Sequence, residues 1–334
     1  MKKRKLALSV ILSLGCLLVS VLLSLALGSK RVSVAEIWDV LSGMDKTSFQ
    51  AAVIQARIPR TIFGIIAGSA LGISGALMQS ITRNPIADPS ILGVNTGASL
   101  FVVCGMSFLG LNTAGQYIWL AIAGAAATAV FVYGIASLGN GGATPLKLAL
   151  AGSAAGTALA SLVNAIMLPN SQVMDSFRFW QVGSIGGATW ENIRLVLPFL
   201  ILGLALSVWI APSLNALVLG DEMAASLGVK AGMVRAVSAL AGVVLCGAVT
   251  AIAGPVGFIG LMVPHLARFL YGADMRLLLP FSAVGGGCLL LFSDVIGRVI
   301  GSPGETEVGI VTAFIGAPVF IVTVCRSRSG KRIV

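Results

Sequence analysis

The residues that could do chemistry in this chain are few and scattered. The one histidine, His265, cannot assemble a metal site by itself, and the five cysteines lack the CxxC spacing of metal or redox sites. No Gly-x-x-x-x-Gly-Lys-[Ser/Thr] loop is present to bind nucleotide phosphates. No nucleophile, base and orienting acid form a readable pattern. The sequence therefore predicts a protein that is not an enzyme, with no metal site and no cofactor of its own.

Ionisable residues inside apolar segments would indicate a proton or sodium relay, because a charge in hydrocarbon is costly. The middle of each long apolar segment lacks Asp, Glu, Lys and Arg. A proton-coupled transporter is therefore disfavoured, although sodium sites built from backbone carbonyls would escape this test. Gln79 and Asn164 are the polar side chains of most interest within these segments. They are candidates for a transport pathway, with interhelical hydrogen bonding as the alternative for both.

The elements that must position these residues are membrane-spanning helices. Hydrophobic residues make up 57% of the chain and charged residues 10%, whereas soluble proteins carry about 25% charged residues. Divided at its charges, the chain yields apolar stretches of the ~20 residues that a ~30 Å hydrocarbon core requires. The expected spans are 6–29, 61–82, two within 89–146, 148–174, 195–220, two within 236–270, 277–293 and 308–325. The predicted fold is all-α, a single polytopic membrane domain over residues 1–334 with about ten spans.

The net charge of +10 could suggest a nucleic-acid-binding protein, but the positions of the charges favour a membrane protein. With ten spans, most of the 22 basic residues and few of the 12 acidic ones fall on one side. The positive-inside rule then places this side and both termini in the cytoplasm. Residues 30–60 become an extracytoplasmic segment. Within it, Val34, Ile37, Trp38 and Leu41 recur at helical spacing, which predicts a short amphipathic helix on the outer surface.

A cytoplasmic loop at residues 213–230 has the features of a short helix of its own. Gly220 ends the preceding span, Asp221 and Glu222 suit a helix N-terminus, and Gly228 suits the C-terminal cap. The apolar docking surface is expected from Ala224, Ala225 and Leu227, with Leu219 and Ser226 in the same segment. The residues alone leave two readings open, a solvated loop or a helix that docks into a cytoplasmic partner.

Two further groups of residues suggest contacts at the ends of the bundle. Arg57, Arg60 and Arg298 are expected at the outer surface, where they could snorkel to the interface or pair with carboxylates of an acidic soluble partner. On the cytoplasmic side, the Pro-containing loop 82–90 must be non-helical. Asn84 and Ile86 in this loop are candidates for a gate at the inner mouth, and a plain connector is the alternative.

Small residues at steps of four indicate close helix packing. Gly64, Gly68, Gly72 and Ala76 form one such stripe. Small residues at this spacing let helix backbones approach closely, which is how helices associate inside lipid. We expect this stripe to lie in a helix interface.

Several long segments of this sequence resemble the FecCD family of ABC importer permeases, which serve ferric siderophores, haem and cobalamin. The resemblance runs nearly end to end. The matching segments are 57–61 (RIPRT), 75–89 (GALMQSITRNPIADP), 219–229 (LGDEMAASLGV), 254–265 (GPVGFIGLMVPH) and 309–318 (GIVTAFIGAP). Segments 92–97 (LGVNTG) and 178–184 (RFWQVGS) look most like siderophore permeases.

The resemblance implies a ten-span subunit of the bacterial cytoplasmic membrane that pairs with an identical or paralogous permease. It implies two cytoplasmic ATPase subunits, which use ATP and Mg²⁺, and an extracytoplasmic substrate-binding protein that carries the ferric siderophore. By the same resemblance, 219–228 is the helix that couples to the ATPase. Arg57, Arg60 and Arg298 would face glutamates of the binding protein. The expected function is siderophore import by alternating access. The alternatives are haem or cobalamin import and, from another class, ion-coupled secondary transport.

Overall fold

The computed structural model describes residues 3–111, 113–139 and 143–328, and these residues form helices and connecting turns without a β-strand. Among these described residues, seven helices are long and apolar enough to cross a membrane, and three helices with shorter described apolar stretches accompany them. The seven are α1 (Lys3–Ala26), α3 (Phe49–Thr82), α5 (Ala114–Ala136), α6 (Pro145–Met167), α8 (Trp190–Val218), α10 (Ala231–Ala253) and α12 (Met275–Ile300). The shorter three are α4 (Val94–Phe108), α11 (Ile259–Tyr271) and α13 (Val308–Arg328). The prediction of an all-α membrane protein is confirmed, and ten as the number of spans stays a prediction.

Four short elements complete the fold. They are α2 (Val34–Leu41), the 3-10 helix η1 (Pro89–Leu92), α7 (Ser171–Val182) and α9 (Asp221–Ser226). The expected amphipathic helix is α2, which begins with a capping box between Ser33 and Glu36. Ile37 is its buried residue, while Val34, Trp38 and Leu41 are exposed.

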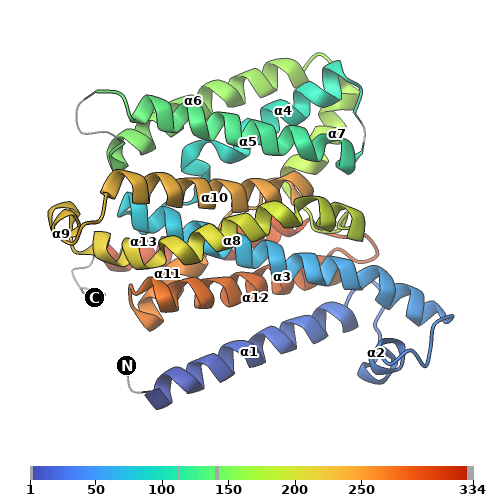
Figure 1. Ribbon diagram of the computed structural model, residues 1–334. Helices are drawn as coiled ribbons and strands as arrows, with labels where there is room; N and C mark the ends of the chain where they lie inside the picture. Colours follow the sequence, from blue (N-terminus) through green and yellow to red (C-terminus); the bar gives the residue numbers. More distant parts are fainter. Residues whose placement is uncertain (1–2, 112, 140–142, 329–334) are drawn as a thin grey trace.

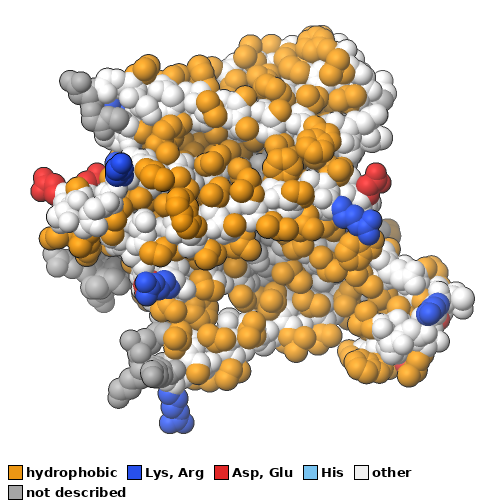
Figure 2. Space-filling model, viewed as in Figure 1, with side chains coloured by type: hydrophobic (Ala, Val, Ile, Leu, Met, Phe, Trp, Pro, Cys, Tyr) orange, Lys and Arg blue, Asp and Glu red, His pale blue; other side chains and the backbone are white. Residues whose placement is uncertain are grey.

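The long helices run side by side, with their ends gathered at two opposite ends of the bundle (Figure 1). Helices α3 and α10 are the most enclosed, with 78% of their apolar windows buried, whereas α1 and α6 lie at opposite edges with 6% and 17% buried. Figure 2 shows hydrophobic side chains over the middle of this face and charged side chains gathered toward its two ends. This distribution is typical of a chain surrounded by lipid.

Glycines let α3 touch its neighbours backbone to backbone. A Cβ added at Gly68 would lie 2.2 Å from the carbonyl oxygen of Gly286, and one at Gly72 would lie 2.1 Å from that of Ser282. A Cβ at Gly75 would lie 1.8 Å from the carbonyl oxygen of Gly260 in α11. The predicted glycine stripe is therefore confirmed as a packing surface, mainly against α12.

Several helix boundaries differ from the prediction. Helix α3 begins at Phe49 rather than Thr61, because Pro59 is accommodated inside the helix and the arginines around it do not end it. Its 34 residues give a length of ~51 Å, so α3 extends well beyond a ~30 Å hydrocarbon core. The span expected over 148–174 ends earlier, at Met167, and its last residues belong to the separate helix α7.

The division of 89–146 and of 236–270 into two helices each is confirmed. The connection around Gly110 separates α4 from α5, and the segment from Gly254 separates α10 from α11. Gly254 has a φ of 69°, and a Cβ there would lie 2.0 Å from the carbonyl oxygen of Trp180 in α7. The break between α10 and α11 is thus packed against the end of α7. Just after α7, the backbone N–H of Ser184 donates to Ala253 O at 2.7 Å.

The start of α1, the end of α13 and helix α9 lie at one end of the bundle, and α2 lies at the other (Figure 1). We refer to these as the α9 end and the α2 end. This arrangement agrees with the expected common side for both termini and the loop 213–230. Assignment of the α9 end to the cytoplasm stays a prediction.

Candidate functional sites at the two ends of the bundle

At the α9 end, the loop that the sequence left ambiguous is a helix. Gly220 and Gly228, with φ of 109° and 77°, flank α9 in backbone conformations that favour glycine. Ala224 is fully buried against the bundle, so it is not part of the docking surface that the sequence predicted. The exposed apolar side chains are instead Leu219, Met223 and Leu227, at 65%, 55% and 61% exposure.

Met223 lies on α9 and Leu227 caps its end four residues later, so these two side chains lie on the same side of the helix, whereas Leu219 belongs to the end of α8 before the non-helical Gly220. Met223 was not among the docking residues that the sequence predicted. Glu222, Ala225 and Ser226 are exposed beside them. Charged and apolar residues together on an exposed short helix suit a groove in a partner protein.

Asp221 at the start of α9 is held by two arginines. Arg83, at the end of α3, donates to Asp221 Oδ1 at 2.5 Å, and Arg235 of α10 donates to Asp221 Oδ2 at 2.7 Å. Desolvation acts to raise the pKa of Asp221, but the hydrogen bond and charge of Arg235 and the charge of Arg83 outweigh it, so the pKa lies below its ordinary value. The carboxylate is therefore ionised at neutral pH.

The loop 82–90 is tied directly to this cluster. Arg83 adopts a left-handed conformation with φ 50° as the C-cap of α3, and its side chain also donates to Leu217 O at 3.1 Å. Asn84 closes the next turn, accepting at Oδ1 from Ile86 N at 3.1 Å. Ile86, 41% exposed, lines a small void with residues of α11 and α13. Their role as a gate stays a prediction.

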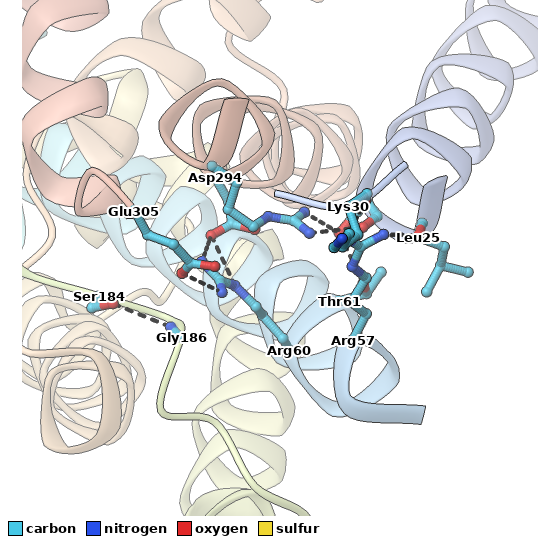
Figure 3. Close-up of polar contacts among 11 residues, drawn as sticks. Leu25, Lys30, Arg57, Arg60, Thr61, Ser184, Gly186, Asp294 and Glu305 are labelled. Carbon is cyan, nitrogen blue, oxygen red and sulfur yellow. Dashed lines mark hydrogen bonds and ion pairs between the residues drawn. The ribbon is translucent and has the colours of Figure 1, made fainter. Parts of the chain in front are cut away.

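At the α2 end, Arg60 joins two acidic residues that the sequence analysis did not connect to it (Figure 3). Its Nη2 lies 2.7 Å from Asp294 Oδ1, and its Nη1 lies 2.7 Å from Glu305 Oε2. Asp294 is 2% exposed and Glu305 is 42% exposed. Arg298 Nε forms a second ion pair with the buried carboxylate, 3.0 Å from Asp294 Oδ2.

The other arginine contacts fix the end of α1. Arg57 donates to the carbonyl oxygens of Leu25 and Lys30, both at 2.7 Å, and Arg298 donates to Ser24 O at 3.1 Å. Arg57 is 8% exposed and Arg298 2% exposed, so neither guanidinium is presented to solvent. The expected surface location of these two arginines is therefore corrected, because carbonyls and carboxylates of this chain take up their donors. Docking of a partner through the three arginines stays a prediction.

Asp294 is the ionisable residue that sequence reasoning overlooked. The expected span ended at Ser293, whereas α12 continues to Ile300 and buries this carboxylate. A usable signal was present, since Asp294 and Arg298 are four apart and Arg57 and Arg60 three apart, spacings that place side chains on one helix face. Paired with two arginines, Asp294 has the environment of a structural ion pair rather than of a relay.

The two pathway candidates lie in opposite environments. Gln79 is fully buried and donates from Nε2 to Leu261 O at 2.9 Å, so in this structure it joins α3 to α11, the alternative that the sequence left open. Asn164 is exposed on α6, the edge helix. A pathway role for either stays a prediction.

Asn164 continues a polar line on the exposed face of α6. Ser153, Thr157 and Ser161 lie four residues apart, the last of them three residues before Asn164, and are exposed as well. Thr157 and Ser161 hydroxyls donate to carbonyl oxygens four residues earlier, each at 3.0 Å. Hydroxyls satisfied in this way can face either lipid or a water-lined surface.

Neither the cysteines nor the histidine forms a chemical centre. Cys16, Cys104, Cys246 and Cys288 are free thiols, and the side chain of Cys325 lies outside the described residues. Within residues 3–111, 113–139 and 143–328, no group of three or more His, Cys, Asp or Glu side chains is placed to hold a metal ion. What the geometry provides is a membrane bundle with the short helix α9 exposed at one end and a buried ionic network at the other.

Comparisons with known proteins place this geometry among transport permeases. The ferric enterobactin transport system permease protein FepD of Escherichia coli (strain K12) is 44% identical over 315 residues, 94% of each chain. The Fe(3+)-citrate import system permease protein YfmD of Bacillus subtilis (strain 168) is 41% identical over 309 residues, 92% of each. Among solved structures, the fold matches an inward-facing metal-chelate type ABC transporter with a TM-score of 0.80 and 28% identity, covering 93% of this chain and 96% of the other.

The sequence profile of the FecCD transport family matches residues 16–326. The match spans nearly all of the helices described above, including α9 and both ionic networks. This chain belongs to the FecCD transport family.

Proposed function

We propose that this chain is the membrane-spanning permease subunit of an ABC importer that moves ferric siderophores across the bacterial cytoplasmic membrane by alternating access. ATP and Mg²⁺ are used by separate ATPase subunits, two per transporter, since the chain carries no phosphate-binding loop. Membership of the FecCD family and the relatives that transport ferric enterobactin and ferric citrate support this assignment.

The observation that carries the proposal is the exposed apolar face of α9. Leu219, Met223 and Leu227 are each more than half exposed at the end of the bundle where α1 begins. Large apolar side chains exposed together outside the bilayer are stabilised when a partner covers them. An ATPase that closes on ATP can move such a helix and thereby the bundle.

A second permease subunit, identical or paralogous, completes the pathway in this proposal. The exposed line from Ser153 to Asn164 supports a polar boundary on α6. The hydroxyls, bonded to their own helix, are compatible with a hydrated route, and the amide of Asn164 favours water over lipid contact. Gln79 contributes by joining α3 to α11 rather than by touching cargo.

A substrate-binding protein docks at the α2 end in this proposal. Arg60 is the arginine of the three best placed for this contact, because it is 14% exposed and its partner Glu305 faces solvent. A carboxylate from the binding protein could take the place of Glu305 on Arg60. Arg57 and Arg298 would support the surface from beneath.

The docking helix is tested by changing its exposed face. Leu227→Glu should weaken co-purification of the ATPase with the permease by about tenfold or more, because a charge would enter an apolar groove. Leu146→Glu, at a residue 69% exposed near the start of α6, is the matched control for adding one charge. Equal ATPase recovery from the two variants would contradict a docking role for α9.

The cargo is tested by uptake in cells with and without this chain. We expect loss of uptake of one class of radiolabelled ferric siderophore, in cells deleted also for paralogous permeases. Loss confined to haem or cobalamin would preserve the importer and change its cargo. Uptake that persists without the ATPase but collapses with an ion gradient would replace the proposal with secondary transport.

A further inference from the structure

Helix α9 is joined to the bundle by flexible connections and one ionic cluster. Gly220 and Gly228 flank it with positive φ, and a Cβ at either would meet no atom within 4 Å. Its packing is against α8 and α10 through the buried Ala224. Such a short helix between two glycines can pivot, so the side-chain contacts decide which other segments follow it.

The ion pair Arg83–Asp221 connects α9 to a segment other than α8 and α10. Arg83 caps the end of α3 and lies 138 residues before Asp221 in the chain. The same guanidinium donates to Leu217 O at the end of α8. Arg83 therefore joins three segments: the end of α3, the end of α8 and the start of α9.

The backbone after Arg83 forms a closed turn that would transmit a displacement. Asn84 accepts from Ile86 N through its side chain and from Ala87 N through its carbonyl oxygen, both at 3.1 Å. Ile86 then lies with Pro85 beside His265 of α11 and Phe320 of α13. A displacement of the Arg83 side chain would thus reach residues that line one void together with two further helices.

We propose that Arg83 is a positioning residue that couples α9 to the loop 82–90, so that movement of α9 by a cytoplasmic ATPase is transmitted through the Arg83–Asp221 ion pair to Ile86. This inference rests on the proposed importer function. Arg235 holds the other oxygen of the same carboxylate and keeps Asp221 oriented toward Arg83. The Arg83–Asp221 ion pair thereby adds a second mechanical connection to the one that the chain itself makes through Gly220 and Gly228.

The simpler reading is that Arg83 and Asp221 form an ordinary surface ion pair. Their side chains are 49% and 45% exposed, and such pairs contribute little to stability. The two readings differ in their consequences. A surface pair can be removed without functional effect, whereas a coupling contact changes the use of ATP while stability stays the same.

The test uses the full transporter, with its ATPase and binding protein, reconstituted in liposomes with radiolabelled ferric enterobactin as probe. Arg83→Ala and Asp221→Asn should each lower the amount of iron imported per ATP hydrolysed by about tenfold, with unchanged melting temperature and ATPase recovery. The double variant should lose no more than either single variant, because one contact is removed in all three. Lys230→Ala, which removes an exposed positive charge beside α9, should keep the wild-type ratio.

A second readout follows the loop directly. ATP should change the rate at which a thiol reagent labels an Ile86→Cys variant, and Arg83→Ala should abolish this change. The chain without the added cysteine gives the background, since Cys16 is exposed. A wild-type import ratio in Arg83→Ala, or an unchanged response of Cys labelling to ATP, would overturn the coupling role. Absence of import by the wild-type complex, both with ferric enterobactin and with the other ferric siderophores of the uptake test, would instead overturn the proposed function.

Discussion

The two ends of the bundle use the same pairing of arginine with carboxylate in different surroundings. At the α2 end, Asp294 and Arg298 are 2% and 3% exposed, enclosed by α1, α3 and α12. At the α9 end, Asp221 and Arg83 are 45% and 49% exposed. The difference indicates that the buried network holds helices in fixed positions, while the exposed cluster can be broken and remade.

The physical basis is the cost of leaving a charge alone. A buried carboxylate without its arginines remains desolvated, so removal of one partner is strongly destabilising. An exposed carboxylate that loses its partner is solvated by water instead, and the measured cost of such losses is small. The four expectations that follow run from the largest effect to the smallest.

Asp294→Asn should destabilise the protein by about 3–5 kcal/mol, because Arg60 and Arg298 would lose their buried counter-charge. Thermal unfolding in detergent, followed by a thiol-reactive dye, gives the measurement. Asp221→Asn is the matched variant at the α9 end and should change stability by less than about 1 kcal/mol. Similar losses in both variants would remove the distinction between the two ends.

Arg57→Leu should loosen the end of α1 at a cost of about 1–3 kcal/mol, because the carbonyl oxygens of Leu25 and Lys30 would lose their donor. Amide hydrogen exchange over residues 25–32 should become faster, with other helices unchanged. The exposed Arg31, replaced by Leu, controls for loss of one charge in the same segment. Unchanged exchange in Arg57→Leu would show that α1 is held by apolar packing.

Glu305→Gln should cost less than about 1 kcal/mol, since this carboxylate is 42% exposed. It should also strengthen binding of the substrate-binding protein, because Arg60 Nη1 would be released from its internal partner. Affinity measured in nanodiscs at low and high salt gives the readout, and Glu307→Gln is the neighbouring control. If affinity falls or stays constant, the partner does not dock through Arg60.

The pH response should be the smallest effect. The pKa of Asp221 lies below its ordinary value, so its contacts are fully present above that value and are lost only as pH falls through the lowered pKa. The iron imported per ATP should therefore stay constant between about pH 8 and pH 5, where an ordinary Asp is also ionised. A fall within this range that Asp221→Asn eliminates would contradict this assignment.

Apolar length and glycine spacing predicted most of the fold from sequence. The division of 236–270 into two spans and the glycine stripe of α3 were expected from residue type, while residue type left the helix at 221–226 open and the resemblance to the FecCD family favoured it. Local charge was less reliable as a boundary. Arg57 and Asp294 were placed outside the spans because they are charged, yet each lies within a long helix where partners from distant segments neutralise or solvate it.

Long-range pairing limited what could be predicted about the sites. The exposed helix α9 was predictable because its glycines and acids are close in sequence. The pair Arg83–Asp221 was not, because its residues are 138 positions apart and only the fold brings them together. The same reason hid the contact of Arg60 with Asp294, 234 positions away.

The contact between α3 and α12 has a consequence for how this protein can change shape. Gly68 and Gly286 approach so closely that a Cβ on either would lie 2.2 Å or 2.0 Å from the other residue's carbonyl oxygen. Two backbones in such contact have no side chains between them that could adopt new rotamers to permit sliding. Helices α3 and α12 should therefore travel as one rigid body through any transport cycle, leaving rearrangement to helices outside this pair, such as the loosely enclosed edge helix α6.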